Sequence, residues 1–309
     1  MTGPARTWKL AGVAVVPLLA GAIIVGCGGD DDQSAGGSTR SAAGSAAEQT
    51  ATDSPVASIS GALHVHGLGV NPAGGELLIA THNGLWSVPP GASEAESVGD
   101  SRDDFMGFAV VGPDRLLSSG HPGTGSDQPP LLGLLGSSDG GGSWRSISLS
   151  GQADLHVLRA NGNRVYGVDS SSGSFLVSND GGNTWLERSA PAPVIDLAIA
   201  PDNPERLVAS TQSGLFRSSD GGRKWSRLAA DRVGLLTWPE KERLLLVDAG
   251  GEVLASADGG GKFRPSGAIG ATPEALGSGE GRIFVAVGGG RVLASTDGGR
   301  NWTPAVEPR

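Results

Sequence analysis

The chain of 309 residues has a single cysteine, Cys27, and a single tyrosine, Tyr166. One cysteine excludes any intramolecular disulfide. Basic residues are also scarce, with 23 Lys and Arg against 32 Asp and Glu and a formal net charge of −9. Because a chain this acidic repels phosphate groups, nucleic acids and anionic lipid head groups are excluded as electrostatic partners.

The N-terminus combines positive charge with a short apolar run. Arg6 and Lys9 precede an uncharged stretch, 10–26, which contains Pro17 and ends Ile-Val-Gly directly before Cys27. This order is typical of a secretory signal, and the stretch is short for a membrane span. The junction resembles a bacterial lipobox, which implies that Cys27 is lipidated and becomes the mature N-terminus. A cleaved signal with an incidental cysteine and an uncleaved anchor are the alternatives.

Three segments are expected from this reading. Residues 1–26 are a lipoprotein signal peptide, and residues 27–58, rich in Gly, Ser, Ala and Thr, form a flexible tether. Residues 59–309 form the folded domain. Removal of residues 1–26 takes away Arg6 and Lys9 and changes the net charge from −9 to −11. We expect a monomeric membrane lipoprotein, exposed on the extracytoplasmic side.

One short phrase is repeated five times along the chain. It reads Ser-x-Asp-Gly-Gly-x-x-Trp, with Phe in place of Trp once, and occupies residues 137–144, 178–185, 218–225, 256–263 and 295–302. A period near 40 residues indicates one supersecondary unit per repeat. The Asp is suited to accept hydrogen bonds from backbone N–H groups of a turn, and the Gly pair permits positive φ. The aromatic residue is expected to fill the gap between neighbouring sheets.

The repeats predict an all-β fold. Each phrase lies between β-type runs bounded by Gly, Pro, Asn and Asp, with four runs per repeat. Residues 63–100 have the same rhythm without the phrase, which brings the number of units to six. Radial repetition of four-stranded sheets gives a six-bladed β-propeller. A linear β-solenoid is the alternative, disfavoured because solenoid coils are usually shorter and no capping unit is present.

The phrase resembles the Asp-box, or BNR repeat, of sialidases, sortilin-type receptors and related bacterial repeat proteins. The segments His64-Val-His66-Gly-Leu, Thr-His82-Asn-Gly-Leu, Asp-Phe-Met106-Gly-Phe and Ser-Gly-His121-Pro resemble a group of exported bacterial Asp-box proteins. Those proteins are described as sialidase-like or glycosyl-hydrolase-like. The resemblance implies a propeller and, as one possible activity, glycoside hydrolysis.

The residues that the sialidase family uses are missing. That family binds the sialic carboxylate with three arginines, uses a Tyr–Glu nucleophile pair with an Asp acid/base, and has an Arg-Ile-Pro segment at the first blade. Here that place reads His64-Val-His66-Gly67, and Tyr166 lies in an apolar strand, where packing is its expected role. Asp104 and Asp154 are the remaining weak candidates for a general acid and base.

The five histidines all fall in the first three units. Aligned first strands place His66, Met106, His156 and Asp196 at one structural position, with His64, Asp104 and Asp154 two residues earlier on the same face. The segments 76–82 and 115–121 match residue for residue and end in His82 and His121. Because innermost strands line a propeller's channel, these side chains are expected around one channel mouth. Blades 4–6 contribute only Asp196 to this position, so the site is expected to be lopsided towards blades 1–3.

These side chains are suited to bind a metal ion. Imidazole with thioether is a copper-compatible set, and imidazole with carboxylate suits zinc. The expected metal ligands are His66, Met106, His156, His82 and His121; His64 and Asp196 complete the expected ligand-binding set. There are two alternatives to a metal site. In the first, the channel is filled with water and these side chains bond to water and to loop carbonyls; in the second, they bind an organic ligand.

The sequence therefore predicts a membrane-anchored propeller that binds a ligand at the channel mouth of blades 1–3, with copper or zinc as the specific case. A glycoside hydrolase of sialidase-like fold is the first alternative, although the residues favour a protein that is not an enzyme. An assembly or sensor scaffold, as in the related plastid photosystem-assembly propellers, is the second.

Overall fold

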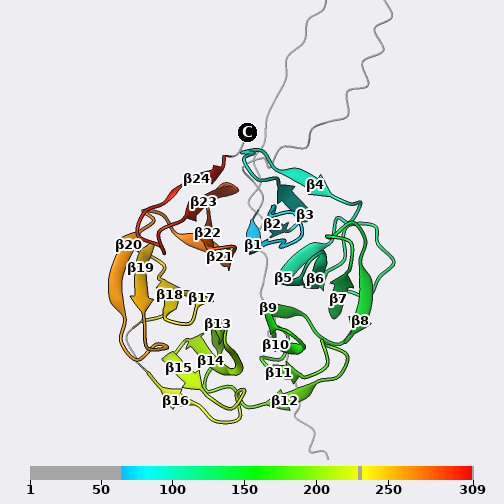
Figure 1. The fold of residues 1–309 in the computed structure, drawn as a ribbon. Coiled ribbons are helices and arrows are strands. Elements are labelled where there is room, and N and C mark those ends of the chain that lie inside the picture. Colours follow the sequence, from blue (N-terminus) through cyan, green and yellow to red (C-terminus); the bar gives the residue numbers. More distant parts are fainter. Residues whose placement is uncertain (1–63, 229–231, 308–309) are drawn as a thin grey trace, which may run out of the picture. The chain divides into compact units, whose positions relative to one another are not determined.

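The computed structural model describes residues 64–228 and 232–307. This part of the chain forms 24 β-strands and no helix, arranged as six antiparallel four-stranded sheets around a central axis (Figure 1). The predicted six-bladed β-propeller is confirmed. The expected signal peptide, the tether and Cys27 lie outside the described residues. Within the described residues, no helix is long and apolar enough to cross a membrane.

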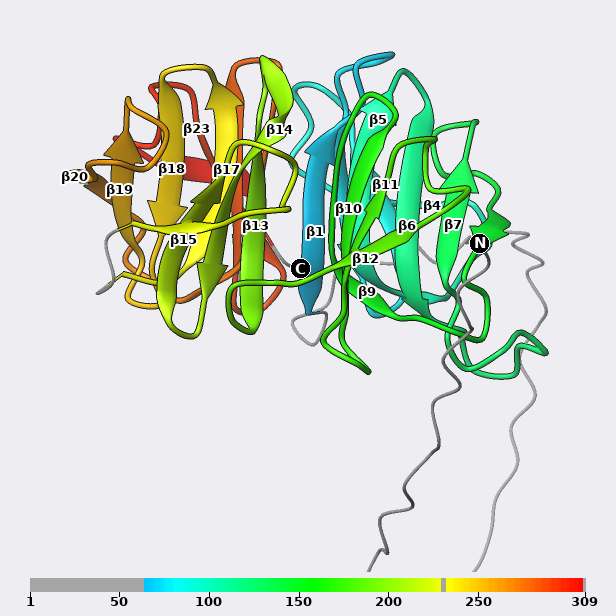
Figure 2. The ribbon, with the colours of Figure 1, turned by 90° about the horizontal axis from the view of Figure 1, so that it is seen from below.

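Each blade runs from the axis outwards in chain order, so its first strand is innermost (Figures 1 and 2). The innermost strands are β1 (Val65–Val70), β5 (Asp104–Gly112), β9 (Leu155–Asn161), β13 (Val194–Ala200), β17 (Leu235–Glu240) and β21 (Pro273–Gly279). The second strands are β2 (Leu77–Thr81), β6 (Arg115–His121), β10 (Arg164–Asp169), β14 (Asn203–Thr211), β18 (Arg243–Val247) and β22 (Arg282–Val287). The third strands are β3 (Gly84–Val88), β7 (Leu134–Ser137), β11 (Phe175–Ser178), β15 (Gly214–Ser218), β19 (Glu252–Ser256) and β23 (Arg291–Ser295). The outermost strands are β4 (Glu96–Val98), β8 (Arg145–Ser148), β12 (Leu186–Arg188), β16 (Ser226–Arg227), β20 (Arg264–Ala268) and β24 (Thr303–Val306).

The hydrophobic core lies between the blades. Six clusters of buried apolar side chains are present, one at each contact between neighbouring blades. The cluster that joins the last blade to the first packs Phe284 of β22 against the same core as Val65 and Ile79 of blade 1. No strand is shared between these two blades, so packing of side chains closes this contact.

The repeated phrase forms the turn between the third and fourth strands of blades 2–6. In blade 3 the buried Ser178 hydroxyl donates to Asp180 Oδ1 (2.7 Å) and accepts from the N–H of Gly182 (2.8 Å), while Asp180 Oδ1 also accepts from the N–H of Thr184 (2.9 Å). The Ser-to-Asp and Gly-to-Ser bonds recur in all five turns. Hydrogen bonds from Thr184 and Ser178 lower the pKa of Asp180 to about 2. The Asp therefore holds the turn.

The aromatic residue that ends each phrase is only half-buried. Trp185 packs against the cluster between blades 2 and 3, and its indole N–H donates to the Ser148 hydroxyl of the preceding blade (3.0 Å). Trp225 meets Phe175 of the preceding blade edge to face, with ring centroids 5.8 Å apart. These rings cover the outer side of the contact between blades, and the smaller aliphatic side chains fill its interior.

Candidate metal site at the channel mouth

A β-bulge near the start of the first strand sets the residues at the channel mouth. In β1 the register shifts between Val65 and Gly67, which leaves His66 without a direct partner on β2. The same shift occurs in β5, β9, β13 and β21. The bulged residues are His66, Met106, His156, Ile195 and Glu274, and all five line a central cavity of about 440 Å³.

The predicted shared position of His66, Met106 and His156 is confirmed, but Asp196 does not belong to it. Asp196 pairs with Ser210 directly after the bulge, and Ile195 occupies the bulged position. The predicted alignment of blade 4 was therefore wrong by one residue, and matching Leu197 with Leu68 gives the correct one. Blades 4–6 also contribute more than was predicted, because Glu274 of blade 6 occupies the bulged position.

The Asp196 carboxylate is fully engaged by the protein. Oδ1 accepts from Arg159 Nη2 (2.6 Å) and from the N–H of Leu197 (2.7 Å), and Oδ2 accepts from the N–H of Leu236 (2.7 Å). Burial raises the pKa of Asp196, although the charge of Arg159 and the backbone hydrogen bonds oppose this. These bonds join the innermost strands of blades 3, 4 and 5, so the carboxylate has a structural task.

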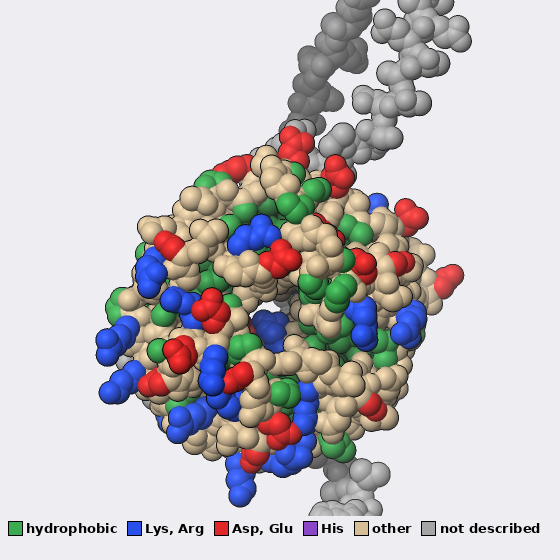
Figure 3. Space-filling view, viewed as in Figure 1, with side chains coloured by type: hydrophobic (Ala, Val, Ile, Leu, Met, Phe, Trp, Pro, Cys, Tyr) green, Lys and Arg blue, Asp and Glu red, His purple; other side chains and the backbone are tan. Residues whose placement is uncertain are grey.

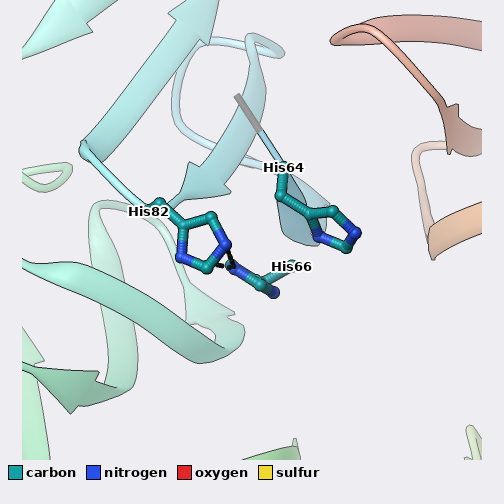
Figure 4. A group of neighbouring side chains, drawn as sticks. All are labelled: His64, His66 and His82. Carbon is teal, nitrogen blue, oxygen red and sulfur yellow. Dashed lines mark hydrogen bonds between the residues drawn. The ribbon is translucent and has the colours of Figure 1, made fainter. Parts of the chain in front are cut away.

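Three imidazoles from blade 1 converge in a group that we call the first histidine cluster: His64, His66 and His82 (Figure 4). His66 Nε2 lies 3.2 Å from both ring nitrogens of His82, and the rings of His64 and His66 have centroids 5.1 Å apart. The antiparallel pairing of β1 with β2 explains the meeting, because the start of β1 lies beside the end of β2.

Two carboxylates flank the first histidine cluster. Asp104, from the neighbouring blade, places Oδ1 2.9 Å from His82 Nδ1 and 3.7 Å from His66 Nε2. Asp104 Oδ1 is buried, and its contact with His82 Nδ1 does not have the angles of a hydrogen bond. On the other side, Glu274 Oε1 lies 3.9 Å from His64 Nε2. Sequence reasoning missed Glu274. Aligning Leu276 with Leu68 places Glu274 at the position in blade 6 that His66 holds in blade 1.

His66 is kept neutral by its surroundings. Burial and the neighbouring charge of His82 lower its pKa to about 4, against the partial opposition of Asp104. Its side chain is 11% exposed. At neutral pH the ring therefore retains a lone pair, which is the form that binds metal ions.

A second group, the second histidine cluster, joins blades 2 and 3: His121, Asp154 and His156. Asp154 Oδ2 lies 2.6 Å from His156 Nε2 and 3.3 Å from His121 Nε2, and accepts from the Ser170 hydroxyl (2.6 Å). The five predicted histidines thus meet at the ends of strands on one side of the propeller, in two groups. Met106 lines the central cavity together with His66 and His156.

The two candidate acid/base carboxylates are each engaged by imidazoles. For Asp154, burial alone would raise the pKa, but the hydrogen bonds from His156 and Ser170 and the charges of both histidines outweigh it, so the pKa is lowered. A glycosidase general acid needs a raised pKa. Asp154 therefore suits a metal ligand better than a proton donor.

Inside the channel, Arg159 is a basic residue that the predicted site did not include. It lines the central cavity, and a basic side chain is visible in the opening in Figure 3, on a face where no histidine is visible. Its three nitrogens donate to Leu197 O, Leu158 O and Asp196 Oδ1. These bonds leave the guanidinium held against the channel wall.

Comparison with known proteins places the chain among β-propellers by fold alone. No protein-family model and no curated protein matches it. The GH74 xyloglucanase from Xanthomonas campestris is similar in structure, with 19% identity, a TM-score of 0.52, and coverage of 81% of this chain and 46% of that one. An ancestral GH74 enzyme shares 14% identity at a TM-score of 0.52, over 81% of this chain and 38% of the enzyme. YCF48 bound to a D1 peptide shares 17% identity at a TM-score of 0.51, over 80% and 81% of the two chains. The chain thus spans less than half the length of the GH74 enzymes, and its neighbours include enzymes and a peptide-bound protein.

We expect no turnover of a fluorogenic sialoside. Tyr166, the one tyrosine, is fully buried, donates to the Pro204 carbonyl (2.8 Å) and stacks on Phe175. Burial raises its pKa to about 12, so it is protonated and out of reach of substrate. The measurement is a fluorescence assay with the wild-type protein. Turnover that survives Tyr166→Phe would show a different nucleophile, and turnover that Tyr166→Phe abolishes would contradict the packing role.

Proposed function

We propose that this protein binds a transition-metal ion, zinc or copper, through the first histidine cluster. The observation that carries the proposal is the approach of His66 to His82, whose ring nitrogens lie 3.2 Å apart. Two ligand atoms on a tetrahedral zinc ion, with bonds of about 2.0–2.1 Å, lie about 3.3 Å apart. The spacing of these two nitrogens is therefore close to that of two ligands on one ion, and His64, whose ligand atom lies within 4.8 Å of theirs, would be the third imidazole.

The carboxylates around the cluster support a cation. Asp104 Oδ1 is buried beside His66 and His82 without an aligned hydrogen bond, and a metal ion among these rings would give it a charge partner. Met106 lines the same cavity as His66 and offers a thioether, which would favour copper. Zinc needs only the imidazoles and a carboxylate.

Metal titration tests the proposal. Full-length protein, purified in detergent and stripped with a chelator, is titrated with Zn²⁺ and with Cu⁺ under reducing conditions, and bound metal is followed by calorimetry and elemental analysis. Binding at micromolar or lower concentration is expected for at least one metal. No binding of either metal at micromolar concentration would refute the proposal and favour an organic ligand.

A protein segment is the second candidate ligand. Ile195 occupies a bulged position on the cavity wall and is 41% exposed, which provides an apolar contact beside the polar mouth. The similar fold of YCF48 is known with a D1 peptide bound. Ile195→Asp should abolish capture of such a segment and leave metal binding unchanged, so the two ligand classes are separable.

The proposed location is the extracytoplasmic side of the cell membrane, with Cys27 as the lipid anchor. The support is the Ile-Val-Gly-Cys junction that follows the short apolar run. We predict that Cys27→Ser leaves the precursor uncleaved or releases the propeller from the membrane. Membrane fractionation with immunoblotting measures this. A Cys27→Ser variant that is still processed and membrane-bound would contradict it.

A further inference from the structure

We infer that the second histidine cluster is a separate metal site, in which His121, Asp154 and His156 bind one divalent ion of borderline softness, zinc or iron(II). This inference rests on the metal chemistry of the proposed function but on none of the ligands of the first histidine cluster. All three ligand atoms lie within 4.8 Å of one another. Two imidazoles and one carboxylate are a ligand set that both metals use.

The tautomer of His121 is determined by a backbone carbonyl. His121 Nδ1 lies 3.1 Å from the Pro130 carbonyl oxygen, which can only accept, so Nδ1 carries the proton. In the neutral ring, Nε2 then presents its lone pair to Asp154 Oδ2 at 3.3 Å. Two acceptors at this distance require a proton or a cation between them. Metal-binding histidines usually donate their other N–H to a carbonyl or carboxylate, as His121 does.

Asp154 is positioned as a ligand that still has a free oxygen. The side chain is 3% exposed, and the Ser170 hydroxyl orients Oδ2. The other oxygen, Oδ1, is buried and has no hydrogen bond. A cation bound at Oδ2 would balance the negative charge of this buried carboxylate.

The geometry requires only a small adjustment to hold the ion. The separation of 3.3 Å between His121 Nε2 and Asp154 Oδ2 equals that expected for two ligands on a tetrahedral ion, about 3.3 Å. The separation of 2.6 Å between His156 Nε2 and Asp154 Oδ2 is a hydrogen bond, and it must lengthen when the metal displaces the proton. His156 is 38% exposed and lies on a strand bulge, so its ring has room to turn.

The two clusters repeat one arrangement between successive blades. His82, directly after β2, reaches Asp104 of blade 2, and His121, at the end of β6, reaches Asp154 of blade 3. Asp104 and Asp154 each lie two residues before the bulged position of their own blade. The repeat thus places a His–Asp pair at two neighbouring contacts between blades, which argues for two ions rather than one shared ion.

The second site leaves coordination positions open. Three protein ligands leave at least one position of a tetrahedral ion free, and His121 and His156 are 43% and 38% exposed. His156 faces the central cavity, so the free position is accessible to a water molecule or to an anionic group entering the channel. In the first histidine cluster His66 is only 11% exposed, whereas His64 and His82 are 53% and 46% exposed.

Metal stoichiometry in variants of each cluster tests the inference. Chelator-stripped full-length protein in detergent is loaded with Co²⁺ or Zn²⁺, and bound ions per chain are counted by native mass spectrometry. Wild type should bind two ions. His121→Gln and His156→Gln should each weaken one site at least about 100-fold and leave one ion. The double variant His66→Gln/His82→Gln should also leave one ion, and the variant with all four changes none.

The possible outcomes separate this inference from the proposed function. One ion in wild type, lost only with His66 and His82, would overturn the second site and sustain the first. Two ions that persist in both His121→Gln and His156→Gln would also overturn the second site, whereas no ion in any variant would refute both. His121→Gln removes a side chain that is 43% exposed, so its melting temperature in chelator should equal that of wild type and show that the fold is intact.

Discussion

Replacing His66 by Gln is expected to weaken zinc binding at the first histidine cluster by at least about 100-fold, because losing only a residue that hydrogen-bonds to a metal ligand already costs about 10–100-fold. His66 is the most enclosed of the three imidazoles, and its Nε2 faces His82 and Asp104. Calorimetric titration of chelator-stripped protein measures the affinity. The second histidine cluster shares no ligand with the first, so its occupancy serves as the internal control.

The same change should remove the part of the thermal stabilisation that comes from metal at the first histidine cluster. An ion at about 100 times its dissociation constant stabilises the folded state by about 2.7 kcal/mol, which for a domain of this size corresponds to roughly 5–10 °C in Tm. We expect wild type to show the sum of two such rises with zinc, one from each cluster, and His66→Gln to show only the rise from the second histidine cluster. His64→Gln is the graded comparison, since His64 lies at the exposed rim of the cluster. An identical rise in wild type and His66→Gln would contradict the assigned ligand.

Gly182→Ala should destabilise the propeller by about 3 kcal/mol or more, whereas Gly181→Ala should cost only about 1 kcal/mol. Both glycines of the turn have positive φ, 91° and 73°. A Cβ on Gly182 would lie 2.1 Å from Leu134 Cδ2 of the preceding blade, but a Cβ on Gly181 meets nothing within 4 Å. The difference of about 2 kcal/mol isolates the clash between blades from the backbone strain. Urea denaturation measures both.

A double-mutant cycle makes the packing argument specific. Leu134 is fully buried in the cluster between blades 2 and 3, and Leu134→Ala opens a cavity at the place where the new methyl group would lie. The double variant Leu134→Ala/Gly182→Ala should therefore be more stable than the sum of the single effects predicts, by at least about 0.5 kcal/mol. Additive effects would show that Gly182 is required for its backbone conformation alone.

Without metal, the stability of the domain should fall as the pH is lowered from 6.5 to about 4. The folded protein holds His66 neutral until its pKa of about 4, whereas the unfolded chain protonates this ring near 6.5. The unfolded state therefore binds the extra proton in this window, and the free energy of unfolding decreases by on the order of 3 kcal/mol towards pH 4. Urea denaturation at several pH values in chelator tests this. A His66→Gln variant with the same slope would contradict it.

The pH dependence of metal binding changes accordingly. A histidine with an ordinary pKa would lose its metal as the pH falls through about 6.5. Because the pKa of His66 is lowered to about 4, proton competition at this ligand begins only near that value. The burial of one ring, which no pattern of residues reveals, thus lowers the pH at which a proton would displace the metal from His66.

The blade architecture could be predicted because its determinants are local. The repeated phrase forms a turn through bonds among residues within a few positions, such as Ser178, Asp180 and Thr184, so its five copies locate blades 2–6, and the matching rhythm of residues 63–100 adds the first blade. The short apolar runs between phrases, bounded by turn residues, indicate strands for the same reason. The shared position of His66, Met106 and His156 also follows from sequence, since these residues hold equal places within matched strands.

The membership of the site depended on contacts that only the closed ring creates. Ile195 holds the bulged position of its strand, and the neighbouring Asp196 instead joins three blades through Arg159 and the N–H of Leu236. Glu274 meets His64 only because the last blade packs against the first. The sequence by itself determined the number of blades, their turns and the histidines at one channel mouth. Only the tertiary structure decided that these histidines divide into two clusters, because each carboxylate between them belongs to the next blade.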